Sequence, residues 1–181
     1  MNFSVYIRPL QLDDALVSYQ WRNNSRIWQH TGAKPDQYIT AEIETEWLVE
    51  VLKRNNEKRF AICLKKNDRY IGNIYLTDVT NKDAQVHIFI GEVELWGKNK
   101  AFEAICLIGM YAFHTLKLEY VYAEIKDSNK ATNALARAVG GSQIEEYYDE
   151  SQSRTIRRWV FNRQMFESST KLTSSTEMKI L

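Results

Sequence analysis

The sequence of 181 residues has few cysteines, almost no net charge and no long apolar run. Its two cysteines, Cys63 and Cys106, fall in apolar stretches without the spacing of metal ligands, so we expect both in the core of a reduced protein and no metal site. The net charge of +1 provides no basic field for nucleic acid. No apolar stretch approaches the roughly 20 residues that span a bilayer, and we recognise no signal peptide. We therefore expect a soluble, cytoplasmic protein without a nucleic-acid or membrane partner.

The chain length suits one domain that buries a substantial core, and no stretch has the composition of an interdomain linker. Residues 167–181 are rich in Ser, Thr and Lys and carry few apolar side chains. We expect one domain over 1–166 and a disordered polar tail over 167–181.

The centre of the sequence is a buried strand followed by a polar turn and an apolar helix. Residues 86–90, VHIFI, have the composition of a buried strand, and apolar residues return at helical spacing from Ala101 onward. The first amides of such a helix have no acceptor within the helix, and the helix dipole adds about half a positive charge there. Lys98 and Lys100 add formal charge. The turn is therefore a candidate anion site, although a solvated turn has the same pattern.

The remaining pattern predicts several more strands and helices. Strands are expected over 3–8, 59–64, 70–76, 120–125, 144–148 and 155–161, and helices over 13–23, 40–54, 101–114 and 129–140. Residues 25–38 show no clear period and are expected to form an aromatic-rich loop. Hairpins combined with strand-helix-strand crossovers predict an α+β fold: a mixed, largely antiparallel sheet of about seven strands with about four helices on its two faces.

Several short motifs, in this order, resemble the GNAT superfamily of acyl-CoA-dependent N-acyltransferases. They are IRPL at 7–10, WRN at 21–23, IGNI at 71–74, WGKNKA at 96–101, and Asn129 at the start of a helix that ends at Gly140. The likeness covers about residues 3–161. It is greatest for the branch that modifies ribosomal-protein N-termini, polyamines and nucleotide-linked amino sugars.

The resemblance implies that acetyl-CoA binds where the fourth strand, 86–90, splays from the fifth, 120–125. The implied cofactor-binding residues lie on the fourth strand, in the turn and at the later helix: Phe89, Ile90, Trp96, Gly97, Lys98, Asn99, Lys100, Ala101, Phe102 and Asn129. Asn99 stands where the family places a glycine, and Asn tolerates a positive φ better than most residues. Ala136 stands where many members have a tyrosine that protonates the leaving thiolate, so no direct acid can be named.

The fourth strand also provides the candidate base. Alternation places Gln85, His87 and Phe89 on one face of the strand and Val86, Ile88 and Ile90 on the other. Gln85 occupies the position of a family glutamate and cannot accept a proton, whereas His87 titrates near neutrality. We take His87 as the candidate base, with a histidine hydrogen-bonded within the sheet as the alternative. Glu92 is the second choice, unless it lies in a solvated turn.

Two further roles concern the remaining polar groups. Asn129 resembles an asparagine that hydrogen-bonds pantetheine or a water molecule in the family, and it also suits a helix cap. A backbone N–H near Ile90 is expected to stabilise the developing oxyanion. The substrate-binding candidates, on the aromatic-rich loop and the adjoining face, are Trp21, Trp28, His30, Tyr38 and Gln85.

These residues and the resemblance predict an N-acetyltransferase that moves an acetyl group from acetyl-CoA to a primary amine, by direct attack through a tetrahedral intermediate. A small amine or amino sugar is favoured as the acceptor. Three alternatives stay open: acetylation of a ribosomal-protein or peptide N-terminus, a catalytically weak acyl-CoA-binding protein, and a domain that binds only a protein partner. A homodimer also stays open.

Overall fold

The computed structural model describes residues 2–31 and 34–173, which fold around one seven-stranded sheet. The strand order is β1-β2-β3-β4-β5-β7-β6, and every neighbouring pair is antiparallel except β4 and β5. The strands are β1 (Val5–Pro9), β2 (Lys58–Leu64), β3 (Tyr70–Thr77), β4 (Asp83–Ile90), β5 (Tyr120–Lys126), β6 (Ser142–Asp149) and β7 (Arg154–Asn162). The prediction of a mixed, mostly antiparallel α+β sheet of seven strands is confirmed.

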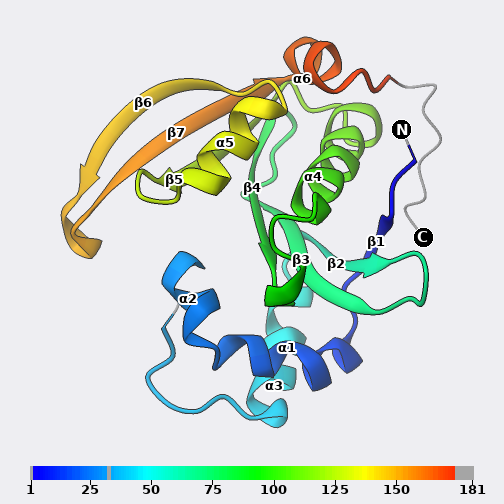
Figure 1. Cartoon of the computed structure of the whole chain (residues 1–181), viewed down its shortest axis with the longest axis vertical. Helices are drawn as coiled ribbons and strands as arrows, with labels where there is room; N and C mark the ends of the chain where they lie inside the picture. Colours follow the sequence, from blue (N-terminus) through cyan, green and yellow to red (C-terminus); the bar gives the residue numbers. More distant parts are fainter. Residues whose placement is uncertain (1, 32–33, 174–181) are drawn as a thin grey trace.

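Six α-helices in the described residues flank this sheet, two more than expected. They are α1 (Ala15–Arg22), α2 (Ser25–Thr31), α3 (Ala41–Leu52), α4 (Lys100–Met110), α5 (Lys130–Ala138) and α6 (Arg163–Thr170). Figure 1 shows α1, α2 and α3 gathered on one side of the sheet, with α4 and α5 on the other and the long β6–β7 hairpin arching away from the rest. One π-helical turn, Tyr111–Thr115, continues α4.

The expectation that residues 25–38 are irregular is wrong for their first half. Residues 25–31 form α2, whose first turn is held by Asn24: its side-chain oxygen accepts the amide of Arg26 at 3.0 Å, and its carbonyl accepts the amides of Ile27 and Trp28 at 2.9 and 3.2 Å. Ile27 is buried in the core between this helix and the sheet. A capping asparagine and one buried anchor define this short helix, and they leave too few apolar residues for a recognisable period.

The expected disordered tail is also wrong over residues 167–173. Residues 163–170 form α6, and the side chain of Asn162 caps it by accepting the amide of Met165 at 2.9 Å. Phe166 and Leu172 are each only 2% exposed and belong to the main core. Two apolar anchors therefore hold a segment whose composition is polar, while residues 174–181 lie outside the described part of the chain.

The predicted alternation along β4 is confirmed by the two separate cores. Val86 and Ile88 pack into the main core, which α4 covers, whereas Phe89 packs with Trp21 and Tyr70 on the opposite face. Cys63 and Cys106 are both buried and free, as expected, and burial raises the pKa of the Cys106 thiol to about 12.

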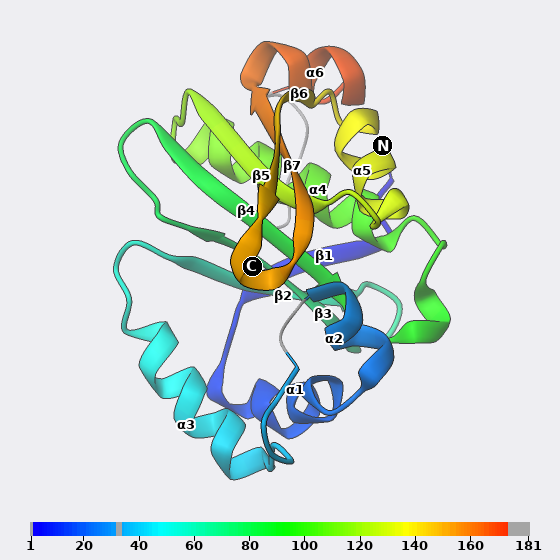
Figure 2. The same ribbon diagram turned by 90° about the vertical axis from the view of Figure 1, so that its left-hand side faces the viewer.

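The predicted separation of the fourth and fifth strands is present. Parallel pairing between β4 and β5 covers three residue pairs, from Asp83 with Tyr120 to Gln85 with Tyr122, and stops there. Beyond Gln85 the two strands diverge, and Figure 2 shows β5, β7 and β6 turning away from β4 with α2 below the hairpin. An opening between the strands therefore begins in the middle of the sheet.

The buried C-terminal segment leads to a stability prediction. Leu172→Ala should lower the free energy of unfolding by about 2–5 kcal/mol, because the change removes a buried side chain and leaves a cavity. Ser168→Ala, at an exposed position on α6, is the matched control and should change stability by less than about 0.5 kcal/mol. Urea denaturation followed by circular dichroism measures both. Equal midpoints for the two variants would mean that the segment does not contribute to the core.

Candidate active site

The opening between β4 and β5 leads into a cleft of ≈ 670 Å³. Its walls come from α4, α5, the second half of β4 and the second half of β5, and α2 contributes Ile27 and His30 at the mouth. Most of these side chains are apolar, and the polar groups gather at the turn before α4 and on the face of the sheet that carries His87. A mostly apolar cleft with few polar groups at fixed positions is typical of a small-molecule site.

The wall formed by β4 presents unpaired backbone groups. The amide of Gly91 donates to the carbonyl of Ile71 on β3 at 2.8 Å. In an antiparallel ladder, every second residue forms its backbone hydrogen bonds with the same neighbouring strand. Gly91, Phe89 and His87 therefore bond to β3, and the backbone groups of Ile88 and Ile90 point toward β5. Since β5 has already diverged there, they face the cleft. The indole Nε1 of Trp96 donates to the Ile90 carbonyl at 2.8 Å.

The turn before α4 supplies a set of free amides. Gly97 and Asn99 have φ values of 74° and 59°, so Asn99 adopts the left-handed conformation that was expected of it. Among the described residues, no acceptor is found for the amides of Gly97, Asn99 and the first three residues of α4, whereas the amide of Lys98 donates to Leu95 at 3.2 Å. We call residues 97–102 the amide cradle.

The lysines of the cradle contribute less than expected. Lys98 is exposed and does not line the cleft. The ammonium group of Lys100 contacts the hydroxyl of Ser4 and lies 3.9 Å from a carboxylate oxygen of Glu103. Glu103 also accepts the amides of Ser4 and Val5 at 2.5 and 3.0 Å and so connects the start of β1 to α4. The anion-binding capacity of the cradle therefore rests mainly on backbone amides.

His87 lies in the cleft wall and is also hydrogen-bonded within the sheet. Its Nε2 is 2.9 Å from the hydroxyl of Thr77, and its ring stacks on Tyr75 with centroids 4.8 Å apart and planes at 13°. The alternative of a histidine hydrogen-bonded within the sheet is therefore confirmed, and the same residue also lines the cleft. Burial, and after it the charge of Arg59, lowers the pKa of His87 below its ordinary value, so the ring is neutral at pH 7 and can accept a proton.

A row of cross-strand partners orients this histidine. Arg59 on β2 lies opposite Tyr75 on β3, and Tyr75 lies opposite His87 on β4. The guanidinium of Arg59 lies 4.4 Å from the centre of the Tyr75 ring and 5.3 Å from that of Trp47, and it pairs with Glu57 at 2.5 Å. The imidazole plane is therefore fixed by a buried stack of side chains.

The opposite wall of the cleft carries a residue that the sequence did not indicate. Glu124 on β5 lines the cleft, and extending the parallel register by two residues beyond Gln85 and Tyr122 brings Glu124 opposite His87. Strand alternation alone predicts that Glu124 shares a face with Tyr122. Only the pairing of β4 with β5 relates this face to His87, and pairing between distant strands cannot be read from one sequence.

Trp21 lies outside the cleft, contrary to expectation, and so does Glu92, the second choice for the base. The carboxylate of Glu92 pairs with Arg69 and accepts the indole N–H of Trp21 at 3.2 Å. Trp21 is only 5% exposed and packs on Tyr70 and Phe89, and a Cβ added at Gly91 would lie 2.1 Å from its ring. Trp21 is a core residue, and Glu92 neutralises Arg69 and holds the indole.

The remaining predicted residues divide between the cleft and its surroundings. His30 lies at the mouth and packs on Trp96 with ring centroids 5.5 Å apart, whereas Trp28, Tyr38 and Gln85 do not line the cleft. Asn129 lines it and also caps α5, since its Oδ1 accepts the amide of Thr132 at 3.1 Å. Nine of the ten predicted cofactor-binding residues, all but Lys98, line the cleft: Phe89, Ile90, Trp96, Gly97, Asn99, Lys100, Ala101, Phe102 and Asn129.

Ala136 lines the cleft on α5 and brings no hydroxyl to it. The side-chain hydroxyls of the described lining residues belong to Tyr75 and Thr132. In residues 2–31 and 34–173, no group of three or more His, Cys, Asp or Glu is placed to hold a metal ion. Over the same ranges, the helices are all too short or too polar to cross a bilayer.

Comparisons with known proteins agree with this geometry. The family model described as "Acetyltransferase (GNAT) domain" matches residues 4–142. The probable N-acetyltransferase YjcK of Bacillus subtilis is 29% identical over 145 residues, which are 76% of this chain and 80% of that protein. The uncharacterized N-acetyltransferase p20 of Bacillus licheniformis is 24% identical over 163 residues, 86% of this chain and 90% of that protein.

Among solved structures, the chain is similar to spermidine N-acetyltransferase from Vibrio cholerae in complex with CoA and spermine. The TM-score is 0.79 with 19% sequence identity, over 91% of this chain and 99% of that one. At this identity the likeness concerns the fold. The family match covers more than half of the sequence, and the chain therefore belongs to the GNAT acetyltransferase family, as an acetyl-CoA-dependent N-acetyltransferase.

Proposed function

We propose that this enzyme acetylates the primary amine of a small acceptor by direct attack of the amine on the thioester of acetyl-CoA. The observation that carries the proposal is the arrangement around the cleft: the amide cradle and the unpaired edge of β4 form one wall, and His87 faces the same opening. An amino sugar or another small amine is favoured over a peptide N-terminus.

The cleft fits coenzyme A chemically. Free amides at a helix N-terminus suit a pyrophosphate, and the unpaired backbone groups of Ile88 and the N–H of Ile90 suit the amide groups of a pantetheine arm. Asn129 lies on the opposite side and can donate through its side-chain amide. When bound, acetyl-CoA supplies the acetyl group as an activated thioester.

His87 is proposed as the general base. An alkylammonium acceptor with a pKa of about 10.4 must lose a proton before its nitrogen can attack. The lowered pKa of His87 keeps its ring neutral at pH 7, so a ring nitrogen is available for that proton. The hydrogen bond to Thr77 and the stack on Tyr75 fix the direction in which the imidazole points.

The backbone of Ile90 is proposed to stabilise the negative charge that develops on the thioester oxygen. Its N–H faces the cleft, and a donor fixed by the sheet needs no reorganisation as charge develops. Ala136 provides no acid for the departing thiolate, so the thiolate leaves unprotonated or takes a proton from water. A coenzyme thiol is acidic enough for this route to support turnover.

The charges near the mouth support an acceptor with one ammonium group and an anionic part. Three carboxylates on this side each lie against an arginine: Glu44 lies 3.2 Å from Arg22, Glu124 2.6 Å from Arg158, and Asp149 3.4 Å from Arg154. Three cations of the same region, Arg26, Lys34 and Lys126, have no carboxylate partner among the described residues. Arg26 and Lys34 lie over the rings of Trp96 and Trp28, and Lys126 donates to the Gln29 carbonyl.

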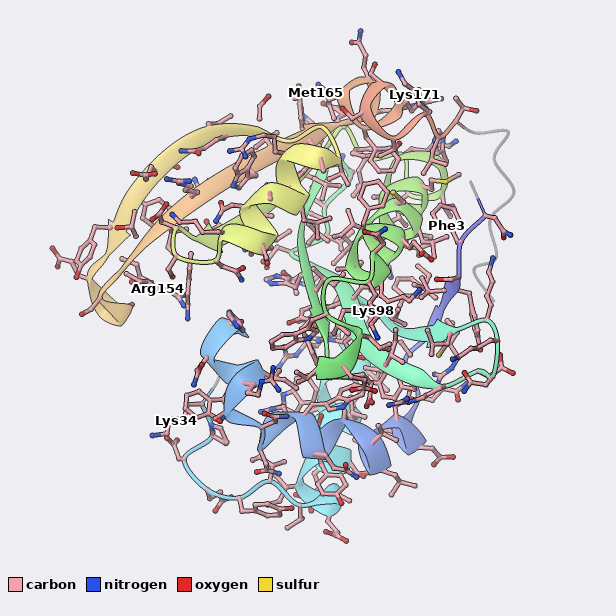
Figure 3. All side chains as sticks on the ribbon, in the orientation of Figure 1. Phe3, Lys34, Lys98, Arg154, Met165 and Lys171 are labelled. Carbon is pink, nitrogen blue, oxygen red and sulfur yellow. The ribbon has the colours of Figure 1, made fainter. Side chains whose placement is uncertain are left out.

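Such a mouth disfavours a polycation. Figure 3 places Lys34 beside α2 and Arg154 on the hairpin, both on the open side of the molecule. A nucleotide-linked or phosphorylated amino sugar offers one amine for His87 and negative charge for these cations, with sugar and base faces for His30 and Trp96. The spermine-binding neighbour shares the fold, and its acceptor is not carried over to this chain.

The amide cradle yields a prediction for coenzyme binding. Asn99→Gly should leave the Kd for coenzyme A within about threefold, since glycine adopts a positive φ freely. Asn99→Val should weaken binding about five- to thirtyfold, because holding a β-branched residue in the left-handed conformation costs roughly 1–2 kcal/mol. Isothermal calorimetry with coenzyme A measures both. Equal affinities in the two variants would exclude this turn as the phosphate site.

A second prediction concerns the base. His87→Gln should lower kcat about 100-fold or more, since general bases contribute roughly that much. In the wild type, kcat should fall as the pH drops through the lowered pKa of His87, below the ordinary value of 6.5, and this acid limb should vanish in the variant. His114→Gln is the control, because His114 does not line the cleft and its Nε2 lies 3.3 Å from a carboxylate oxygen of Glu167. A His87 variant that keeps the wild-type pH profile would remove the base assignment.

The acceptor class is tested with a panel of amines. We expect a nucleotide-linked amino sugar and glucosamine 6-phosphate to give kcat/KM values at least about tenfold above that for spermidine at low salt. The ratio should fall as the salt concentration rises, because salt screens the charges at the mouth of the cleft. Release of coenzyme A thiol measures turnover. A preference for spermidine would contradict the anionic acceptor. Coenzyme binding without thiol release on any amine would favour the catalytically weak binding protein instead.

A further inference from the structure

We propose that Glu124 binds the ammonium group of the acceptor, across the cleft from His87. This inference deepens the proposed function and rests on it. It assigns a role to a residue on β5 that lines the cleft and whose side chain is 28% exposed.

The first step of the argument is the register of the sheet. On one side of the cleft, Arg59, Tyr75 and His87 are cross-strand partners on β2, β3 and β4. On the other side, Glu124 on β5 is the partner of Arg158 on β7, which in turn faces β6. These side chains form a polar row across one face of the sheet, with a gap where β4 and β5 diverge. A ligand group that enters the gap on this face lies between His87 and Glu124.

The second step is the net charge on the far side of that gap. Arg158 donates from Nε and Nη2 to the same oxygen of Glu124, Oε1, at 3.1 and 2.6 Å, and from Nη1 to Glu145 at 2.8 Å. One guanidinium is therefore shared by two carboxylates, and the group of three carries a net charge of −1. The other oxygen of Glu124 takes no part in the pair with Arg158. The wall facing His87 thus attracts a single cation.

The third step is the proton and bond balance. The acceptor binds as an ammonium ion with Glu124 as its counter-ion, and neutral His87 takes one proton from its nitrogen. The free amine then forms a bond to the acetyl carbon, and the carbon–sulfur bond breaks with its electron pair on sulfur. The second proton of the attacking nitrogen passes to the thiolate or to water, and His87 returns its proton to solvent. No oxidant or reductant is needed.

The position of Glu124 also explains how a basic mouth and an amine substrate can coexist. The unpaired cations Arg26 and Lys126 would repel an ammonium group that approached alone. One carboxylate opposite the base gives that group a fixed place, and the cations remain available to the anionic part of the same molecule. Glu124 therefore binds the ammonium group of the acceptor, and the cations bind the anionic part of the same molecule.

The experiment measures steady-state kinetics of Glu124→Gln with glucosamine 6-phosphate, a nucleotide-linked amino sugar and spermidine as probe acceptors. The amide keeps the size of the side chain and removes its charge. We expect the KM for the amine that the wild type acetylates best to rise about tenfold or more, the loss typical of a charged hydrogen bond, with the KM for acetyl-CoA unchanged. Glu146→Gln is the matched control, since Glu146 lies on the same hairpin, pairs with Arg157 and does not line the cleft, and it should leave both values within about twofold.

A double variant, Glu124→Gln with Arg158→Gln, separates loss of the counter-ion from disturbance of the hairpin. If the single change acts only by leaving Arg158 unpaired, the double variant should recover the wild-type KM, and that recovery would overturn the proposal. Persisting loss in the double variant supports it.

Inhibition by a hydroxyl analogue provides an independent readout. With coenzyme A bound, the wild type should bind glucosamine 6-phosphate more tightly than glucose 6-phosphate, and Glu124→Gln should erase the difference. Equal binding of the two sugars by the wild type would overturn the ammonium site. A wild type that acetylates none of the probes would overturn the proposed function, whereas turnover that Glu124→Gln leaves unchanged would overturn only this inference.

Discussion

The structure depends on the early end of the pairing between β4 and β5. The two parallel strands, which α4 connects, form three residue pairs and then diverge. The main core continues behind the opening through α4, α5 and residues such as Phe161, so the sheet loses ladder hydrogen bonds without losing its hydrophobic support. The unpaired edge of β4 is a cost to the empty protein, and a ligand with its own amide groups can satisfy it.

Trp96 connects the two functional halves of the site. Its indole N–H is fixed on the Ile90 carbonyl, its ring receives His30 and Arg26 from α2, and the next residue opens the amide cradle. The side of the cleft proposed to receive the acceptor and the side proposed to hold the coenzyme are thus both in contact with Trp96. A displacement of α2 would be transmitted to the end of β4, because both contact the same rigid side chain.

Features of the site that depend on neighbouring residues in the sequence were predicted, whereas features that depend on contacts between distant segments were not. The tolerance of Asn99 for positive φ, the alternation through His87 and the capping role of Asn129 depend on neighbours in the sequence, and each was found. Trp21 and Glu92 were misjudged because an indole and a carboxylate satisfied each other across the fold. Glu124 gave no signal, since its relation to His87 exists only once β5 lies beside β4. The helices α2 and α6 were missed because only one or two buried apolar residues anchor each segment, which is too few for a recognisable period.

The proposed transfer of a proton to His87 depends on what sets the charge of its ring. Burial and, after it, the charge of Arg59 disfavour the imidazolium form, whereas Asp78, Glu57 and Glu124 favour it, and the net effect lowers the pKa of His87. In the proposed mechanism the ring is therefore neutral at pH 7 when the acceptor binds, and the ammonium group of the acceptor pairs with Glu124. Once the acceptor nitrogen has bonded to carbon it no longer competes for the proton, and the lowered pKa of His87 favours release of that proton to solvent. In the proposed mechanism, the same burial that keeps the ring neutral before the reaction thus also returns it to the neutral form afterwards.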